Sequence, residues 1–194
     1  RHLLNRTGFG APQQQVASYA KLSREQAVER LLAGARSTPL LKPPSLVHEP
    51  LFRVRELGEE EKKAALRAEF EKGVELRAWW LQEMLQTPSP LSERMTLFWH
   101  NHFVSSQQKV KSGKLMLDQN LLLRRHALGN FGELLHAVAK DPAMIIYLDA
   151  ATNRKGQPNE NFAREVMELF TLGEGHYGEQ DIKEAARAFT GWTV

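Results

Sequence analysis

The amino-acid sequence predicts an all-α protein, and three observations support this prediction. Strand patterns are scarce, because the chain has no alternating run of Val, Ile and Thr and no Asn-Gly hairpin turn. Helical patterns are abundant, with apolar residues recurring three and four positions apart. Gly and Pro divide these patterns into segments of helix length. We therefore expect a multi-helix globular bundle with one long helix, a Pro-rich connection and no substantial sheet.

Length and composition agree with a single domain over residues 1–194. The hydrophobic share of 42% and the charged share of 25% are ordinary for a globular protein. No apolar run reaches the roughly 18 to 20 residues that a membrane helix needs. The net charge of +3 is too small to indicate a nucleic acid partner. The chain has no Cys, which excludes disulfides, thiol catalysis and thiolate metal sites.

Both ends suggest a portion of a longer domain. Arg1 is not an initiator methionine, and the chain stops at Val194 directly after the end of a helical pattern. We expect a C-terminal part of the same protein to be missing here, and any export signal would precede Arg1.

The first quarter of the chain predicts two helices and an irregular connection. Pro12 favours the start of a helix that runs to about Leu22. Residues 23–26 read Ser-Arg-Glu-Gln, a capping-box pattern for a second helix that Gly34 ends. Residues 37–50 contain four Pro and no periodicity, which predicts a Pro-rich surface connection.

The long helix is predicted over residues 59–86. Its three leading Glu suit a helix N-terminus, and a Thr-Pro-Ser-Pro segment follows it. Gly73 costs it about 1 kcal/mol relative to Ala. The positions expected to face the core are Leu66, Phe70, Val74, Trp80, Leu81 and Leu85.

The remaining helices are shorter. They are expected over residues 91–103, 114–128, 130–140, 159–173 and 179–189, with a short apolar segment at 143–148. The helix over 159–173 is amphipathic. Its expected core face is Phe162, Ala163, Val166, Leu169 and Phe170.

Two histidines lie close together in the segment Trp-His-Asn-His-Phe at residues 99–103. Residues two apart on a helix point about 200° apart, so His100 and His102 cannot bind one metal ion together. His102 falls within an apolar stripe, which predicts a hydrogen-bonded core histidine. His100 falls on the other side, where it is either a functional ligand or a merely structural residue.

The polar face of the 159–173 helix carries carboxylates at helical spacing. Glu160, Arg164 and Glu168 follow one another at intervals of four, and Asn161 and Glu165 form a second row. One interpretation is a solvated ladder of salt bridges. The other is a carboxylate cluster, held by the arginine, that faces a cleft and binds a metal or transfers protons.

Two further features suit polar or anionic ligands. Three Asn and one Gln lie between residues 153 and 161, and amides such as Asn159 and Asn161 bind polar ligands. Residues 104–130 hold five basic side chains against one acid, and Arg124 with Arg125 could receive a phosphate, a sulfate or an acidic polymer. A solvated basic loop is the alternative.

Several segments resemble one large bacterial family, catalogued as domain of unknown function 1800 (DUF1800). The segments that carry the resemblance span residues 1–10, 98–103, 124–131, 141–149, 159–173 and 186–192. The resemblance implies an exported protein, periplasmic or extracellular, that is considerably longer than this chain. It implies no established activity.

Three hypotheses for the function follow. The first is a metal-dependent enzyme, in which His100 and His126 meet Glu165 and Glu168 across a cleft, with Arg164 orienting a carboxylate. Such a set suits a divalent Zn, Mn or Fe ion and a metal-bound water or oxygen. The second is a cell-envelope binding or assembly module for an acidic polysaccharide or a partner protein. The third is haem ligation by His100 or His102.

Overall fold

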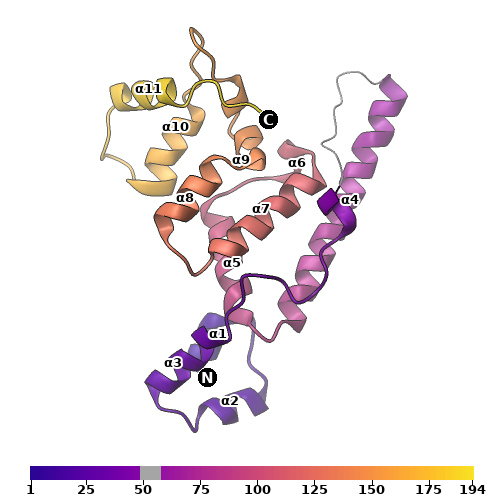
Figure 1. Ribbon diagram of the computed structural model, residues 1–194, viewed down its shortest axis with the longest axis vertical. Helices are drawn as coiled ribbons and strands as arrows, with labels where there is room; N and C mark the ends of the chain where they lie inside the picture. Colours follow the sequence, from indigo (N-terminus) through magenta and orange to yellow (C-terminus); the bar gives the residue numbers. More distant parts are fainter. Residues whose placement is uncertain (49–57) are drawn as a thin grey trace.

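The computed structural model describes residues 1–48 and 58–194, and its fold is all-α, as predicted (Figure 1). Among these residues there is no strand, and the β pairing is confined to an isolated bridge between Arg154 and Gln157. No helix in the described part is both long enough and apolar enough to cross a membrane.

The helices follow one another in a simple order. The α-helices are α1 His2–Thr7, α2 Gln13–Tyr19, α3 Arg24–Ala33, α4 Glu59–Gln86, α5 Pro90–His102, α6 Gln107–Val110, α7 Gly113–His126, α8 Phe131–Ala139, α9 Pro142–Tyr147, α10 Asn161–Glu165 and α11 Glu179–Ala188. Two 3₁₀-helices, η1 Ser45–His48 and η3 Ala150–Thr152, and one π-helix, η4 Val166–Thr171, complete the set.

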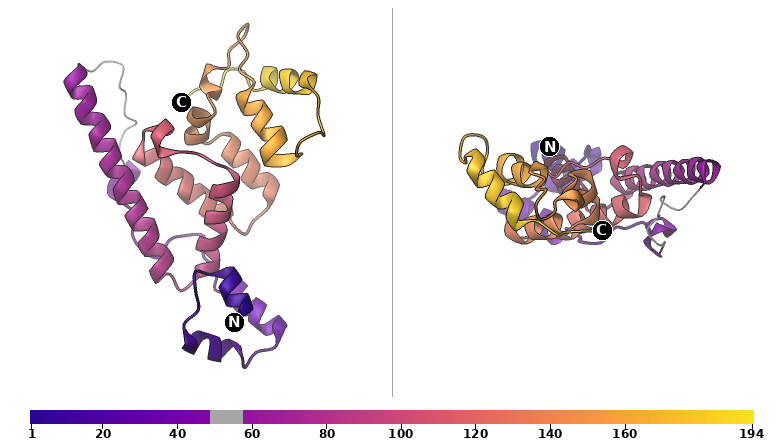
Figure 2. Two further views of the ribbon diagram at one scale, coloured as in Figure 1. Left: turned by 180° about the vertical axis from the view of Figure 1, so that it is seen from behind. Right: turned by 90° about the horizontal axis from the view of Figure 1, so that it is seen from above.

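Helix α7 lies at the centre of the molecule. It packs against α4, α5 and α8, and Figures 1 and 2 show α4 along one side and α10 and α11 on the other. One hydrophobic cluster, with Phe103, Leu123 and Phe162, joins α7 to the C-terminal helices. A second, with Trp79 and Leu117, joins it to α4. Helices α1 to α3 form a separate lobe below them.

Helix α4 has the predicted ends, but the prediction of its core face was wrong. Its buried residues are Glu69, Gly73, Leu76, Trp79 and Glu83. The positions that were expected inside include four that are exposed: Phe70, Val74, Leu81 and Leu85. The physical reason is that both buried glutamates have backbone partners. The Glu83 carboxylate accepts hydrogen bonds from the backbone N–H groups of residues 40 and 41, each at 2.7 Å, and that of Glu69 accepts one from residue 113 at 2.8 Å.

Residues 37–48 run beside α4, to which the bonds from residues 40 and 41 tie them. Leu46 of η1 is buried in the cluster that α4 and α7 share. Residues 49 and 50 of the predicted connection lie outside the described residues.

The predicted helix over 159–173 is two elements. It begins as α10 and continues as the π-helix η4. A π turn contains more residues than an α turn, so the α-helical spacing does not hold beyond Glu165. Phe162, before the π-helix, and Phe170 are buried as expected, whereas Leu169 within the π-helix is 59% exposed.

Candidate functional site

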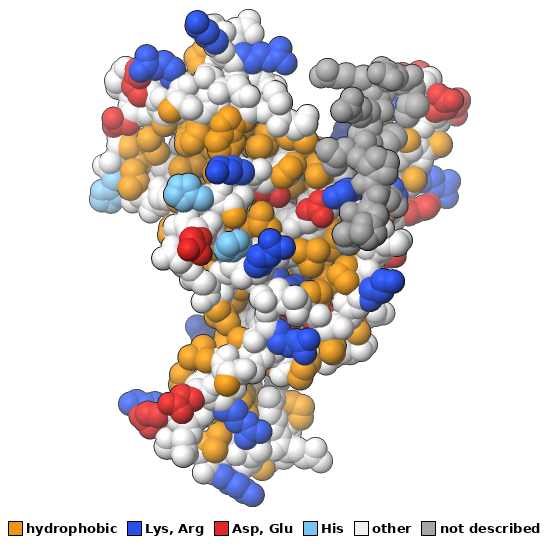
Figure 3. Space-filling view, in the orientation of Figure 1, with side chains coloured by type: hydrophobic (Ala, Val, Ile, Leu, Met, Phe, Trp, Pro, Cys, Tyr) orange, Lys and Arg blue, Asp and Glu red, His pale blue; other side chains and the backbone are white. Residues whose placement is uncertain are grey.

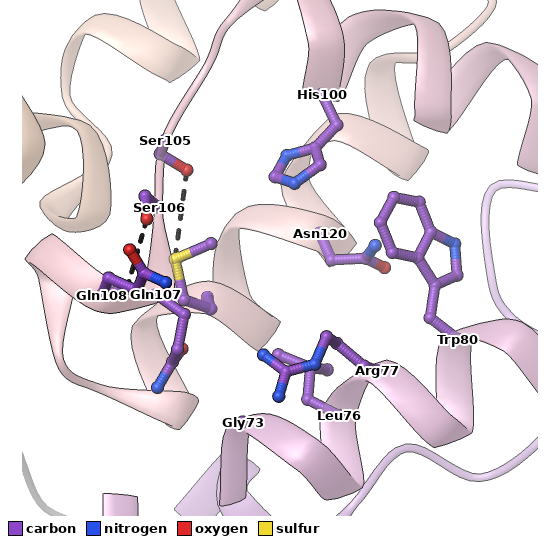
Figure 4. A pocket seen from close by; sticks show the side chains of 11 residues that line it. Gly73, Leu76, Arg77, Trp80, His100, Ser105, Ser106, Gln107, Gln108 and Asn120 are labelled. Carbon is purple, nitrogen blue, oxygen red and sulfur yellow. Dashed lines mark hydrogen bonds between the residues drawn. The ribbon is translucent and has the colours of Figure 1, made fainter. Parts of the chain in front are cut away.

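His100 lines a cavity of about 370 Å³ between α4, α5, α7 and residues 105–108 (Figure 4). The cavity is within the size range of small-molecule sites. Its lining combines one charged side chain with amides, hydroxyls and a few apolar groups. The eleven lining residues are Gly73, Leu76, Arg77, Trp80, His100, Ser105, Ser106, Gln107, Gln108, Met116 and Asn120.

The imidazole of His100 is half-buried on the wall of this cavity. It contacts Trp80 edge to face, with 5.5 Å between the ring centroids. Burial lowers the pKa of His100, because removing the charged imidazolium from water is unfavourable. The indole N–H of Trp80 donates a hydrogen bond to the Glu93 carboxylate at 2.9 Å, which fixes the indole. Burial thus favours the neutral ring of His100, which has one donor and one acceptor nitrogen.

Asn120 presents a fixed donor to the cavity. Its Oδ1 accepts a hydrogen bond from Nη2 of Arg124 at 2.9 Å. Since the amide oxygen is held by the arginine, the amide NH₂ group is the part that remains for a ligand.

Gln107 presents an acceptor. Its Nε2 donates to the backbone oxygen of Glu69 at 3.3 Å, while its Oε1 is buried and has no hydrogen-bond partner among the described residues. The side chain can lie this close to α4 because Gly73 has no Cβ, which would stand 3.1 Å from Gln107 atoms. A buried acceptor without a partner is costly, so a ligand hydroxyl would be favoured there.

Arg77 gives the cavity lining its positive charge. No Asp or Glu is among the eleven lining residues, and no other described residue forms a hydrogen bond or ion pair with its guanidinium. Figure 4 shows that guanidinium pointing into the cavity, towards the side of residues 105–108. The cavity is therefore positively charged and rich in donors, a combination that suits an anionic group.

The carboxylates of the predicted enzyme site lie elsewhere. Arg164 binds both oxygens of Glu179, at 3.0 and 3.1 Å, and also pairs with Glu160. The phenol of Tyr177 donates to Glu168 at 2.8 Å. Burial, together with the nearby charge of Glu168, raises the pKa of Glu165. Arg164 thus links α10 to α11 through Glu179, and its pair with Glu160 is the one pair of the predicted ladder that it forms among the described residues.

The structure does not assemble the predicted metal site. In the described ranges, no group of three or more His, Cys, Asp or Glu side chains is arranged to hold a metal ion. His100 faces α4 and α7, whereas Nε2 of His102 lies 3.2 Å from the backbone oxygen of Phe170 in η4. Because residues two apart on a helix point in nearly opposite directions, His100 faces away from Glu165 and Glu168. His126 lies half-buried in the last turn of α7.

A comparison with protein families gives a match over nearly the whole chain. The model described as "Protein of unknown function (DUF1800)" matches residues 2–194. The chain belongs to the DUF1800 family. Neither a curated protein nor a solved structure matches it. Since the DUF1800 description names no activity, the chemistry of the cavity is the basis for a functional proposal.

In this DUF1800 protein, the side chain of Arg124 lies inside the molecule rather than on its surface. Its side chain is buried, forms an ion pair with Glu93 and lies over the ring of Trp79, 5.6 Å from the ring centroid. Burial lowers the pKa of Arg124 to about 10. Arg124 acts on the cavity indirectly, by orienting Asn120. Arg125, the next residue, is exposed.

The asparagines of the 153–161 loop bind the chain itself. Asn159 donates from Nδ2 to Thr152 at 2.9 Å, and its Oδ1 accepts from the backbone N–H of Asn161 at 3.0 Å. Asn161 donates from Nδ2 to the backbone oxygen of Leu148 at 3.1 Å. The loop uses these amides to fix its own shape, and a role of Asn159 and Asn161 in ligand binding stays a prediction.

Proposed function

We propose that this protein is a binding module that holds an acidic saccharide unit in the cavity beside α4. The observation that carries the proposal is the charge of Arg77, which faces a cavity without any acidic lining residue. Arg77 is an exposed residue, but its guanidinium has no acidic partner in the cavity, so an anionic ligand is favoured over a neutral one because it supplies a countercharge.

The remaining lining groups define the rest of the ligand. A carboxylate would accept hydrogen bonds from the guanidinium of Arg77 and from the amide of Asn120. A hydroxyl would donate to the unpartnered Oε1 of Gln107. Trp80 offers an aromatic surface to the apolar side of a sugar ring. A uronic acid, which combines one carboxylate with several hydroxyls, has this set of groups.

The cavity favours binding over catalysis. His100 has no carboxylate partner among the lining residues to orient it as a general base. The hypothesis of a metal-dependent enzyme loses its support, because His100 does not line the same site as Glu165 and Glu168, which were expected to complete the ligand set. We include in the proposal an exported location, periplasmic or extracellular, where acidic polysaccharides of the cell envelope occur.

Calorimetric titration tests the proposal directly. We expect a trimer of galacturonic acid to bind, and a neutral galactose trimer of the same linkage to bind at least tenfold more weakly. Arg77→Gln removes the cation and is expected to weaken binding of the acidic trimer about tenfold or more, because a charge-assisted hydrogen bond contributes about 1.5–3 kcal/mol.

The matched control is Arg67→Gln. Arg67 lies on the same helix, its side chain is 82% exposed and it does not line the cavity, so this variant should bind like the natural protein. Added chelator should have no effect. Equal binding of acidic and neutral trimers, binding that survives Arg77→Gln, or binding of neither trimer would each rule out the proposal.

A further inference from the structure

The outer face of α4 carries a row of large apolar side chains that nothing in the described structure covers. Phe70 is 62% exposed, Val74 45%, Leu81 60% and Leu85 82%. We call these four residues the outer stripe. Hydrophobic side chains show along the side of the molecule that α4 forms in Figure 3. A contiguous apolar row on a surface helix indicates an interaction site more often than isolated exposed residues do.

The four residues share one face of the helix. At 100° per residue, Phe70, Val74, Leu81 and Leu85 fall within an arc of about 60°. This arc lies roughly opposite to Leu76 and Trp79, which face the core. Figure 2 shows that α4 runs along the outside of the molecule for most of its length. The outer stripe is therefore accessible from solvent along the helix.

We propose that two copies of the chain pair through the outer stripe, with their α4 helices antiparallel. The spacing of the stripe is symmetric, because the pairs 70/85 and 74/81 have the same midpoint, between residues 77 and 78. In an antiparallel pair related by a two-fold axis at that point, Phe70 meets Leu85 of the second copy. Val74 meets Leu81 in the same way. Such self-complementarity is what a two-fold interface requires.

Charge supports the antiparallel direction. Lys63 and Arg67 continue the same face of α4 towards its N-terminal end, beyond the apolar row. In the antiparallel pair they lie beside the C-terminal end of the second α4, whose last turn contains no basic residue. Cations near a helix C-terminus are stabilising, because the last carbonyl groups carry partial negative charge. Parallel pairing would instead place the basic residues of both copies side by side.

Arg77 does not oppose the pairing. It is next to the symmetry point and at the edge of the arc that the stripe occupies, and its guanidinium points into the cavity (Figure 4). The stripe extends over about 22 Å of helix, which makes a contact at the small end of specific interfaces. We therefore expect a dimer that dissociates at concentrations on the order of micromolar.

Sedimentation equilibrium of the full 194-residue chain tests the pairing. The average mass should rise towards that of a dimer as the concentration passes through the micromolar range. Leu81→Lys should keep the protein monomeric over the same range, because it places a charge in the middle of the apolar contact. The control is Leu32→Lys on α3, which is 54% exposed and lies outside the stripe, and it should dimerise like the natural chain.

Single cysteines test the direction of the pair, because the natural chain has none. Oxidation should crosslink Ala78→Cys into a covalent dimer, since this exposed position is next to the symmetry point. Lys63→Cys should not crosslink, because the two copies of residue 63 lie about 43 Å apart in the antiparallel pair. Three results would overturn the proposal. The natural chain could remain a monomer at all concentrations, the Leu81→Lys variant could still dimerise, or both cysteine variants could crosslink equally.

Discussion

Asp141 is a buried carboxyl group with a strongly shifted pKa. It caps α9, where its Oδ2 accepts hydrogen bonds from the backbone N–H of Met144 at 3.0 Å and from Nε2 of Gln119 at 2.7 Å. Burial raises its pKa from 3.8 to about 6, although both hydrogen bonds act in the opposite direction. A raised pKa in the folded state means that the folded protein binds this proton more tightly than the unfolded chain does.

The stability of the protein should therefore depend on pH through Asp141. The contribution of the protonated carboxyl is fully present below about pH 4 and is lost as the pH rises through about 6. We expect the free energy of unfolding of the natural protein, measured relative to Asp141→Asn, to fall by up to about 3 kcal/mol between pH 4 and pH 7. Urea denaturation of both proteins across this range measures the difference. A difference that does not change with pH would contradict the assignment.

At the residue scale, helical spacing predicts which side of a helix a residue occupies, but not what covers it. The spacing separated His100 from His102, and the two histidines do face different parts of the molecule. The sequence could not distinguish Arg124 from Arg125. Both are basic and adjacent, and the burial of Arg124 depends on Glu93 and Trp79, which lie far away along the chain.

At the element scale, the ends of α4 were predictable and its orientation was not. Three Glu at the start and a Pro-containing segment after Gln86 are local signals. The inward direction of Glu69 and Glu83 depends on backbone N–H groups more than forty residues away. Because the sequence does not reveal those partners, it predicts that the apolar face of α4 packs against the core.

Gly73 was treated as a weak point of α4, but it is where Gln107 approaches the helix. An Ala at this position gains about 1 kcal/mol of helix propensity. Its Cβ would also stand 3.1 Å from the side chain of Gln107, which would have to move and lose its bond to the backbone of Glu69. That bond contributes about 1 kcal/mol, so Gly73→Ala alone should leave the free energy of unfolding nearly unchanged.

Removing the Gln107 side chain should reveal the gain in stability that Gly73→Ala brings through helix propensity. In the background of Gln107→Ala, the change Gly73→Ala should stabilise the protein by about 1 kcal/mol, since only the helix propensity remains. Urea denaturation of the four proteins of this double-mutant cycle gives both values. If Gly73→Ala stabilises the natural protein and the Gln107→Ala variant equally, the side chain of Gln107 does not restrict residue 73.

At the scale of the whole molecule, the all-α class followed from periodicity, whereas the cavity did not. Its walls come from α4, α5, α7 and residues 105–108, which are separate in sequence. Only their tertiary arrangement places Arg77, Gln107 and Asn120 around one space. A sequence signal for this site existed in Gly73, because an internal glycine in a long helix suggests a close approach by another segment.

The N-terminal lobe, α1 to α3, is attached to the rest of the protein mainly at the start of α5. Leu91 of α5 packs with Leu4 and Leu31 in a small cluster that holds the lobe together. The backbone N–H of Arg36 also donates to the hydroxyl of Ser92 at 2.8 Å. Because this cluster is separate from the clusters around α7, the lobe should be able to unfold on its own.

Leu91→Ala should uncouple the lobe without unfolding the central helices. Truncating a buried leucine costs about 2–5 kcal/mol, which is large for a cluster built on three buried residues. Hydrogen exchange followed by mass spectrometry should show faster exchange in peptides from residues 2–33 and unchanged exchange in residues 113–126. Leu117→Ala, which removes a fully buried side chain of α7, is the control and should speed exchange throughout the molecule. If Leu91→Ala instead speeds exchange equally in both regions, the lobe and the central helices unfold as one unit.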